Sequence, residues 1–143
     1  MTEQVTGRCE VLLIGGRSGV GKSSVAVELH EQLAVQGVQH ALIEGDNLDV
    51  ASPAPWEHGL AAKNLAAMWR SYSELGHRRL IYANTNSVRD SGVLLDAVGG
   101  RPRAIGVLLT AADAEVRDRL ARREIGSALE EHIERSRRAA ARL

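Results

Sequence analysis

Short apolar runs alternate with longer stretches of helical periodicity along this chain. Four runs have the length of strands: residues 9–14 (CEVLLI), 40–43 (HALI), 80–83 (LIYA) and 104–109 (AIGVLL). The first run is continuous and ends at Gly15 and Gly16, which is typical of a central strand buried on both faces. Polar residues follow each run.

Apolar residues three or four positions apart predict two long helices, each with a glycine at its end. The first covers residues 22–36 and stops at Gly37, and the second ends at Gly76. The stripe of the first helix comprises Val25, Leu29 and Leu33. The stripe of the second comprises Ala61, Leu65, Met68, Tyr72 and Leu75.

Capping residues predict three further helices. Ser87 could cap a short helix that runs through residues 95–98, and residues 110–113 resemble a capping box that opens the next helix. Ser127 and Glu130 have the same spacing as that box and predict a last helix towards the C-terminus.

Strands that alternate with helices predict an α/β fold with a parallel, doubly wound sheet and right-handed crossovers. Ligands of such sheets bind beyond the carboxyl ends of the strands, where the polar residues of this chain lie. Residues 1–143 show no repeat, no low-complexity tract and no linker, so we expect a single domain.

The segment between the first strand and the first helix predicts a phosphate-binding loop. Residues 16–23 (GRSGVGKS) match the pattern G-x-x-x-x-G-K-[ST] at every fixed position. Its glycines let backbone N–H groups turn towards phosphate oxygens, and the following helix adds its positive dipole end. Lys22 would reach the β- and γ-phosphates of ATP, and Ser23 would offer its hydroxyl to Mg²⁺. The residues that we expect to bind the nucleotide are Gly16, Arg17, Ser18, Gly19, Val20, Gly21, Lys22, Ser23 and Ser24.

Composition narrows the class of partner. Eighteen Lys and Arg residues balance eighteen Asp and Glu residues, and a net charge of zero disfavours nucleic acid or an anionic membrane surface as partner. Cys9 is the only cysteine, and the sequence has neither a signal-peptide pattern nor an apolar run of membrane-spanning length. We expect a cytoplasmic protein with small-molecule ligands, while the sequence leaves its oligomeric state open.

The acidic residues after the second strand distinguish between kinds of phosphate-loop protein. Motor ATPases and GTPases usually place an acidic residue after a later apolar strand, where this chain has Asn84, and the guanine motif asparagine-lysine-any-aspartate is absent. Asp46 is therefore the best acidic candidate, either as a base for the acceptor hydroxyl or as a partner of Mg²⁺, with Asp49 as a weaker substitute. Alternatively, the sequence Gly45-Asp46-Asn47 is simply a turn.

These segments together resemble a known superfamily. GGRSGVGKSS followed by IEGDNLD is similar to segments of the P-loop small-molecule kinases. Among these, adenylyl-sulfate kinase has a comparable acidic segment, and Glu44 replaces its first aspartate in this sequence. Residues 116–123 (VRDRLARR) resemble the arginine-bearing lid of gluconate and shikimate kinases, and chloramphenicol phosphotransferase is a more distant likeness. The resemblance implies a three-layer α/β/α P-loop NTPase fold of the nucleoside-kinase type. Such kinases usually have a fifth strand, so it also implies that the C-terminal strand is missing from this sequence.

By this resemblance, Asp46 orients or deprotonates the acceptor hydroxyl, and residues 115–130 form the lid. Arg119 and Arg123 lie four residues apart and could share one helix face, from which they would neutralise the transferring phosphate. The alternative is a solvated helix face, because acidic residues alternate with these arginines.

Two tryptophans and a polar strand end are further candidates. Trp56, in a proline-containing loop, could stack on a substrate ring or pack beneath its loop. Trp69 is offset from its helix's apolar stripe, which indicates a structural or a lid-facing position. Asn84, Asn86 and Arg89 could hydrogen-bond a substrate, although polar loop ends need no function.

The leading hypothesis is an enzyme that transfers the γ-phosphate of ATP to a hydroxyl of a small molecule, with Mg²⁺ as cofactor. Sugar acids, nucleotides, sulfur nucleotides and antibiotics all remain open as acceptors. Two alternatives remain: a regulatory module that binds nucleotide without phosphorylating a metabolite, and a toxin-like kinase of sugar nucleotides.

Overall fold

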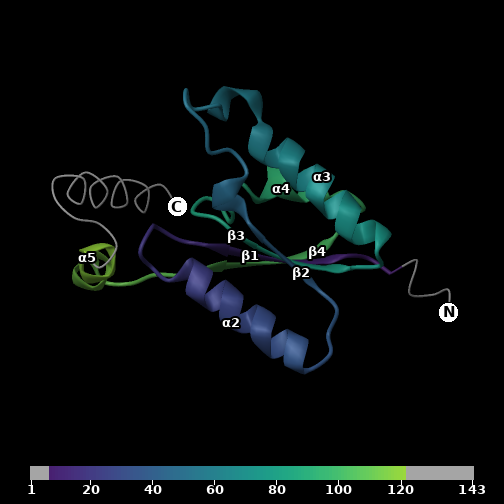
Figure 1. Cartoon of the computed structure of the whole chain (residues 1–143), viewed down its shortest axis with the longest axis horizontal. Coiled ribbons are helices and arrows are strands. Elements are labelled where there is room, and N and C mark those ends of the chain that lie inside the picture. The colour runs from purple at the N-terminus through teal and green to yellow at the C-terminus, as the bar shows by residue number, and fades with distance from the viewer. Residues whose placement is uncertain (1–6, 122–143) are drawn as a thin grey trace.

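Four parallel strands form one sheet in the order β2-β3-β1-β4. Figure 1 shows this sheet between the helices. The structure is a computed structural model, and it describes residues 7–121 of the chain. The strands are β1 (Glu10–Gly15), β2 (Ala41–Glu44), β3 (Arg79–Ala83) and β4 (Arg103–Leu108). The helices are α2 (Lys22–Val35), α3 (Leu60–Glu74), α4 (Ser91–Val98) and α5 (Asp113–Ala121), with single-turn 3-10 helices η1 (Gly45–Asn47) and η2 (Trp56–His58).

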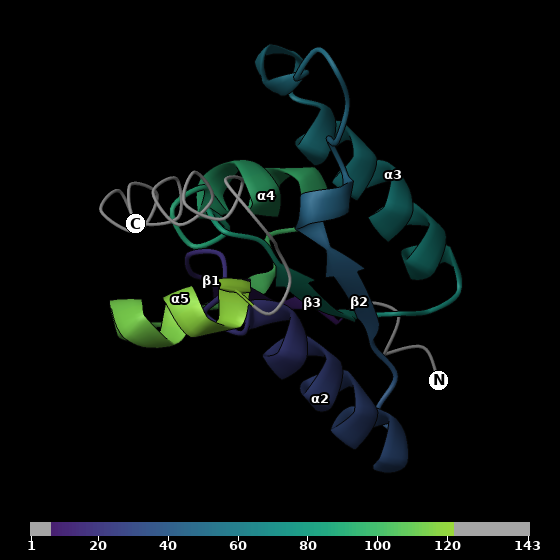
Figure 2. The same cartoon turned by 60° about the vertical axis from the view of Figure 1, so that its left-hand side comes forward.

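The sheet is the middle of three layers. Helix α2 covers one face, and α3 and α4 cover the other, as the two views in Figures 1 and 2 agree. Below the α3 and α4 layer lies the larger core, in which Leu65, Trp69 and Leu94 pack on inward side chains of β1, β2 and β3. Ala26 of α2 packs on the opposite face of the sheet. This architecture confirms the predicted α/β fold with a parallel sheet.

Strand register brings the carboxyl ends of the strands to one edge of the sheet. Ile14 of β1 lies opposite Ala83 of β3 and Val107 of β4, and Glu44 of β2 also lies opposite Ala83. The segments after β1, β2 and β3 therefore begin side by side. These are the segments in which the sequence placed its candidate chemistry.

The buried faces of the two long helices differ from the predicted stripes by one or two residues. Val25 of α2 is 44% exposed, and the neighbouring Ala26 takes the buried position instead. In α3 the buried residues are Leu65 and Trp69, while Met68 is 37% exposed. Trp69 is 4% exposed, so of its two predicted positions the structural one is right and the lid-facing one is wrong.

Ser87 does not cap α4, contrary to the expectation from the sequence. The helix begins four residues later, at Ser91, with Asp90 at its N-cap. Ser87 is fully buried, and its hydroxyl donates a hydrogen bond to the carbonyl oxygen of Ile14 at 2.8 Å. This hydroxyl therefore joins the end of β1 to the segment after β3, which is a tertiary role that local capping patterns do not reveal.

Strand β4 is the least covered part of the sheet. All six of its residues are exposed, and Ile105 retains 67% of its accessible surface. Within residues 7–121, no helix is both long enough and apolar enough to cross a membrane.

Candidate active site

The predicted phosphate-binding loop turns between β1 and α2, and residues from the end of β4 through α5 pack closely against it. Gly16 has a φ of +142°, and a Cβ there would lie 2.7 Å from the carbonyl oxygen of Leu109. A Cβ on Gly19, where φ is +85°, would lie 3.0 Å from a methyl carbon of Val116 in α5. Only glycine meets both the backbone angle and the space at these two positions.

Lys22 begins α2 and points back across the loop. The residue is 7% exposed, and its ammonium group donates a hydrogen bond to the carbonyl oxygen of Arg17 at 3.1 Å. An ammonium group carries three donors, which suits it to bind phosphate oxygens. The cation is thus held over the loop at the helix N-terminus, where an anion is favoured.

Arg17 ties the phosphate loop to α5. Its side chain is buried, and its guanidinium forms an ion pair with the carboxylate of Asp113, the first residue of α5. Residues 96 positions apart in the sequence therefore meet at the loop. The packing of α5 against Gly19 gives the same helix a second contact with the loop.

Ser23 meets the end of β2 across the site. Its hydroxyl donates a hydrogen bond to Oε2 of Glu44 at 3.3 Å. The other carboxylate oxygen of Glu44, Oε1, is buried and has no hydrogen-bond partner within the described part of the chain. Mg²⁺ takes oxygen ligands, and in nucleotide sites it usually binds one or two protein oxygens together with phosphate. The unpartnered Oε1 of Glu44 and the Ser23 hydroxyl beside it therefore suit Mg²⁺.

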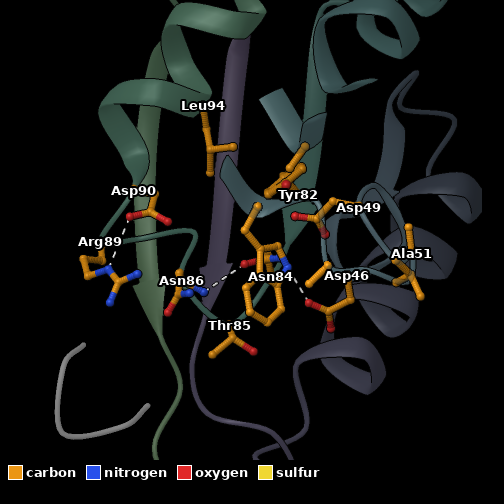
Figure 3. A pocket seen from close by; sticks show the side chains of 14 residues that line it. Asp46, Asp49, Ala51, Tyr82, Asn84, Thr85, Asn86, Arg89, Asp90 and Leu94 are labelled. Carbon is orange, nitrogen blue, oxygen red and sulfur yellow. Dashed lines mark hydrogen bonds and ion pairs between the residues drawn. The ribbon is translucent and has the colours of Figure 1, made fainter. Parts of the chain in front are cut away.

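Asp46 follows in η1 and lies at the surface. Its Oδ1 accepts a hydrogen bond from the side-chain amide of Asn84 at 3.0 Å, and the amide oxygen of Asn84 accepts one from the backbone N–H of Asn86 at 2.9 Å (Figure 3). This chain of contacts fixes Asp46 between the ends of β2 and β3. The described side-chain partner of Ser23 is thus Glu44, while that of Asp46 is Asn84.

A pocket of about 770 Å³ opens beside these residues. It is lined by Asp46, Asp49, Val50, Ala51, Ala54, Trp56, Ala61, Tyr82, Asn84, Thr85, Asn86, Arg89, Asp90 and Leu94. Thr85 also connects the pocket to the phosphate loop, because its carbonyl oxygen accepts a hydrogen bond from the N–H of Gly16 at 3.2 Å. The pocket therefore adjoins the nucleotide loop, and its volume suits a small metabolite.

Tyr82 forms part of the pocket wall from the end of β3. Burial, and then the negative charges of Asp49, Asp46 and Asp90, raise the pKa of its hydroxyl to about 12. A Cβ on Gly45 would overlap this hydroxyl, so glycine is required there for the ring to reach the pocket. The phenol thus stays protonated at neutral pH and can donate a hydrogen bond.

The structure brings together the predicted phosphate loop, Asp46 and the polar residues after β3. Trp56, Asn84, Asn86 and Arg89 all line the pocket, as the positions of their segments suggested. The predicted lid is only partly within the described residues: the backbone of Arg119 lies in α5, its side chain is not described, and Arg123 lies outside the described residues. The helix predicted from Ser127 also lies outside them.

Two residues of the candidate site, Glu44 beside Ser23 and Tyr82 in the pocket wall, were not predicted from the sequence. Glu44 was noted only as a replacement within the acidic segment, although its position as the last residue of a parallel strand could have indicated a place at the site. Tyr82 lies inside an apolar run, and nothing in that run distinguishes a wall residue from an ordinary core residue.

Comparisons with known proteins agree with this geometry. Residues 8–54, which contain the phosphate loop and Glu44, match the adenylylsulphate kinase family. No curated protein is significantly similar to the chain in sequence.

Solved structures with the same fold include the APS kinase of Mycobacterium tuberculosis in complex with AMPPNP and APS, which is 22% identical with a TM-score of 0.58 over 86% of this chain and 76% of that one. The tunicamycin resistance protein of Deinococcus radiodurans is also 22% identical, with a TM-score of 0.57 over 89% and 79% of the two chains. A gluconokinase of Sinorhizobium meliloti is 18% identical, with a TM-score of 0.55 over 91% and 74%. These neighbours establish the fold, and the family match over residues 8–54 agrees with the resemblance to P-loop small-molecule kinases.

Proposed function

We propose that this chain is an ATP-dependent phosphotransferase that moves the γ-phosphoryl group of ATP to a hydroxyl of a small molecule. The observation that carries this proposal is the junction of two sites: the phosphate loop, with Lys22 held over it, adjoins a polar pocket through Thr85. A module that only bound nucleotide would not need such a pocket beside the phosphates. The match to the adenylylsulphate kinase family supports the same reaction class.

In the proposed reaction, the acceptor oxygen attacks the γ-phosphorus, a new P–O bond forms, and the bond between that phosphorus and the bridging oxygen breaks to release ADP. Asp46 lies at the pocket wall and would orient the acceptor hydroxyl and take its proton. Lys22 would stabilise charge on the phosphoryl oxygens. Such transfer depends mainly on positioning and charge neutralisation, so few groups are required.

Ser23 and Glu44 would hold Mg²⁺, since the unpartnered Oε1 of Glu44 and the Ser23 hydroxyl offer oxygen atoms beside the loop. When bound, the ion would supply neutralisation of phosphate charge. Asp46 remains the second candidate for this role, although in the structure its carboxylate is engaged by Asn84.

Nucleotide binding is the first test of this function. Mg²⁺-ATP should raise the melting temperature of the wild-type chain, by a stabilisation of about 2.7 kcal/mol at a nucleotide concentration 100 times Kd. Lys22→Met keeps the buried aliphatic stem but removes the charge, so the variant should fold, lose most of this stabilisation and lose roughly 10²-fold or more in turnover.

ADP release with a panel of hydroxylated metabolites then tests transfer itself. Turnover that depends on an acceptor supports the phosphotransferase, while nucleotide binding with no acceptor-dependent turnover would favour the regulatory module. Val25→Ala, on the exposed side of α2, is a matched control that should leave nucleotide binding unchanged.

A further inference from the structure

The pocket beside the phosphate loop has an excess of negative charge. Its described lining contains three carboxylates, Asp46, Asp49 and Asp90, and the guanidinium of Arg89 as its one cation, which leaves a net charge of −2. Arg89 is already engaged, because its Nε donates to a carboxylate oxygen of Asp90 at 3.3 Å (Figure 3). An acceptor therefore meets carboxylates that no cation of the described lining neutralises.

Asp49 is the carboxylate most available to a ligand. It makes no hydrogen bond or ion pair with another described residue, whereas Asp46 is held by Asn84 and Asp90 by Arg89. Asp49 is half-buried in the pocket wall, so a charge brought to it is only partly screened by water. A cationic group is the partner that such a carboxylate favours.

Tyr82 independently points to a ligand in the same pocket. The residue is 1% exposed, yet its hydroxyl makes no hydrogen bond with any described residue and faces the pocket. Because Tyr82 lines the pocket, a ligand bound there can give this hydroxyl a hydrogen-bond partner in place of water. Asp46 and Asp49 line the same pocket as Tyr82, and their charges add to the effect of burial in raising the pKa of its hydroxyl.

Trp56 adds an aromatic surface to the pocket wall. The residue is 75% exposed, although tryptophan is on average highly buried. The face of an indole ring attracts cations as well as the apolar face of a sugar-like ring. An exposed indole, an open carboxylate and an unpartnered phenol therefore occur together in one pocket.

We propose that the phosphoryl acceptor is a hydroxylated compound that carries a protonated amine. Asp49 pairs with the ammonium group, the Tyr82 hydroxyl forms a hydrogen bond with the same molecule, and the Trp56 ring covers it. This inference rests on the proposed function, since it names the class of molecule that occupies the acceptor pocket. It disfavours sugar acids and sulfur nucleotides, because their negative charge would approach Asp46 and Asp49.

Three hexoses of similar size and different charge test this proposal: D-glucosamine in its protonated form, D-glucose and D-glucuronate. Their binding to the full chain is measured by calorimetry in the presence of Mg²⁺ and a non-hydrolysable ATP analogue. D-glucosamine should bind tightest, about tenfold or more better than D-glucuronate, and the difference should shrink as salt concentration rises. Equal affinities, tighter binding of D-glucuronate, or binding of none of the three would overturn the proposal.

Two pocket variants, each with a control elsewhere in the chain, test whether the preference for D-glucosamine arises in the pocket. Asp49→Asn should weaken D-glucosamine binding several-fold and narrow its advantage over D-glucuronate, while Asp96→Asn, the same change on the exposed face of α4, should do neither. Tyr82→Phe should weaken all three sugars, with Tyr72→Phe as its control. If Asp49→Asn instead lowers Mg²⁺ affinity and leaves D-glucosamine binding unchanged, the carboxylate serves the metal and the proposal fails.

Failure of this proposal is separable from failure of the proposed function. Stabilisation by Mg²⁺-ATP without any sugar reports the phosphate loop alone. If that stabilisation is present and only D-glucuronate binds, the kinase assignment stands and the amine assignment is rejected.

Discussion

At the scale of single residues, two carboxylates next to the phosphate loop have different surroundings and so different expected roles. Glu44 contacts the hydroxyl of Ser23, which belongs to the loop, whereas Asp46 contacts Asn84 and lines the acceptor pocket. Replacing each by its amide removes the charge and keeps the shape. The two variants can therefore separate metal binding from proton transfer.

Asp46→Asn should spare Mg²⁺-ATP binding and lower transfer by about 10²- to 10⁴-fold, which is the usual contribution of a general base. Glu44→Gln should instead raise the Mg²⁺ concentration needed for half-maximal stabilisation by ATP. Thermal shifts over a Mg²⁺ series, together with ADP release, measure both effects. The reverse pattern, with metal dependence altered only by Asp46→Asn, would exchange the two roles.

Tyr82 predicts a stability change at alkaline pH. Its folded-state pKa of about 12 exceeds the ordinary 10.0, so below pH 10 the phenol is neutral in both states and its contribution to stability is fully present. As pH rises through 10 to 12, the unfolded chain ionises first, and the free energy of unfolding falls. Tyr82→Phe should remove this part of the fall.

Tyrosinate absorbance provides a direct check of that shift. The chain has two tyrosines, so in Tyr72→Phe the signal comes from Tyr82 alone. A midpoint near the ordinary value in the folded protein would show that the hydroxyl is neither buried nor surrounded by the carboxylates.

At the scale of elements, the hydroxyl of Ser87 joins two segments that form the site. It donates a hydrogen bond to the carbonyl oxygen of Ile14 near the end of β1, and the segment that carries it also accepts, at the Thr85 carbonyl, a hydrogen bond from Gly16. Ser87→Ala should lower the free energy of unfolding by about 1 kcal/mol, the usual net value of one hydrogen bond. The cost stays modest because the Ile14 carbonyl keeps a second donor, the N–H of Asn84 at 3.0 Å.

Denaturant unfolding of Ser87→Ala beside Ser71→Ala measures this contribution. Ser71 is an exposed serine whose hydroxyl bonds within α3, so its replacement should change stability by less than about 0.5 kcal/mol. If both variants lost the same free energy of unfolding, the buried hydrogen bond of Ser87 would contribute no more than the exposed one of Ser71.

At the scale of the whole molecule, periodicity and the phosphate-loop motif were sufficient to predict the fold and the edge of the sheet where the site lies. Each strand was placed within one residue of its bounds, because turn residues and glycines mark the ends of these runs. The pairing of Glu44 with Ser23, and the burial of Trp69 rather than Met68, depend on how elements pack. Contacts between elements that are distant in the sequence do not follow from local sequence patterns, so these two features could not be predicted.

The contacts of the phosphate loop also have a consequence for the order in which the protein is synthesised. The loop occupies residues 16–23, but its shape depends on Leu109 beside Gly16, on Asp113 beside Arg17 and on the α5 residues that pack against Gly19. Strand β1 likewise gains one of its two neighbours only when β4 is made. A nascent chain therefore carries the complete phosphate-loop motif long before it can hold that motif in shape, and we expect ATP to stabilise the protein only after residues 103–121 have been synthesised.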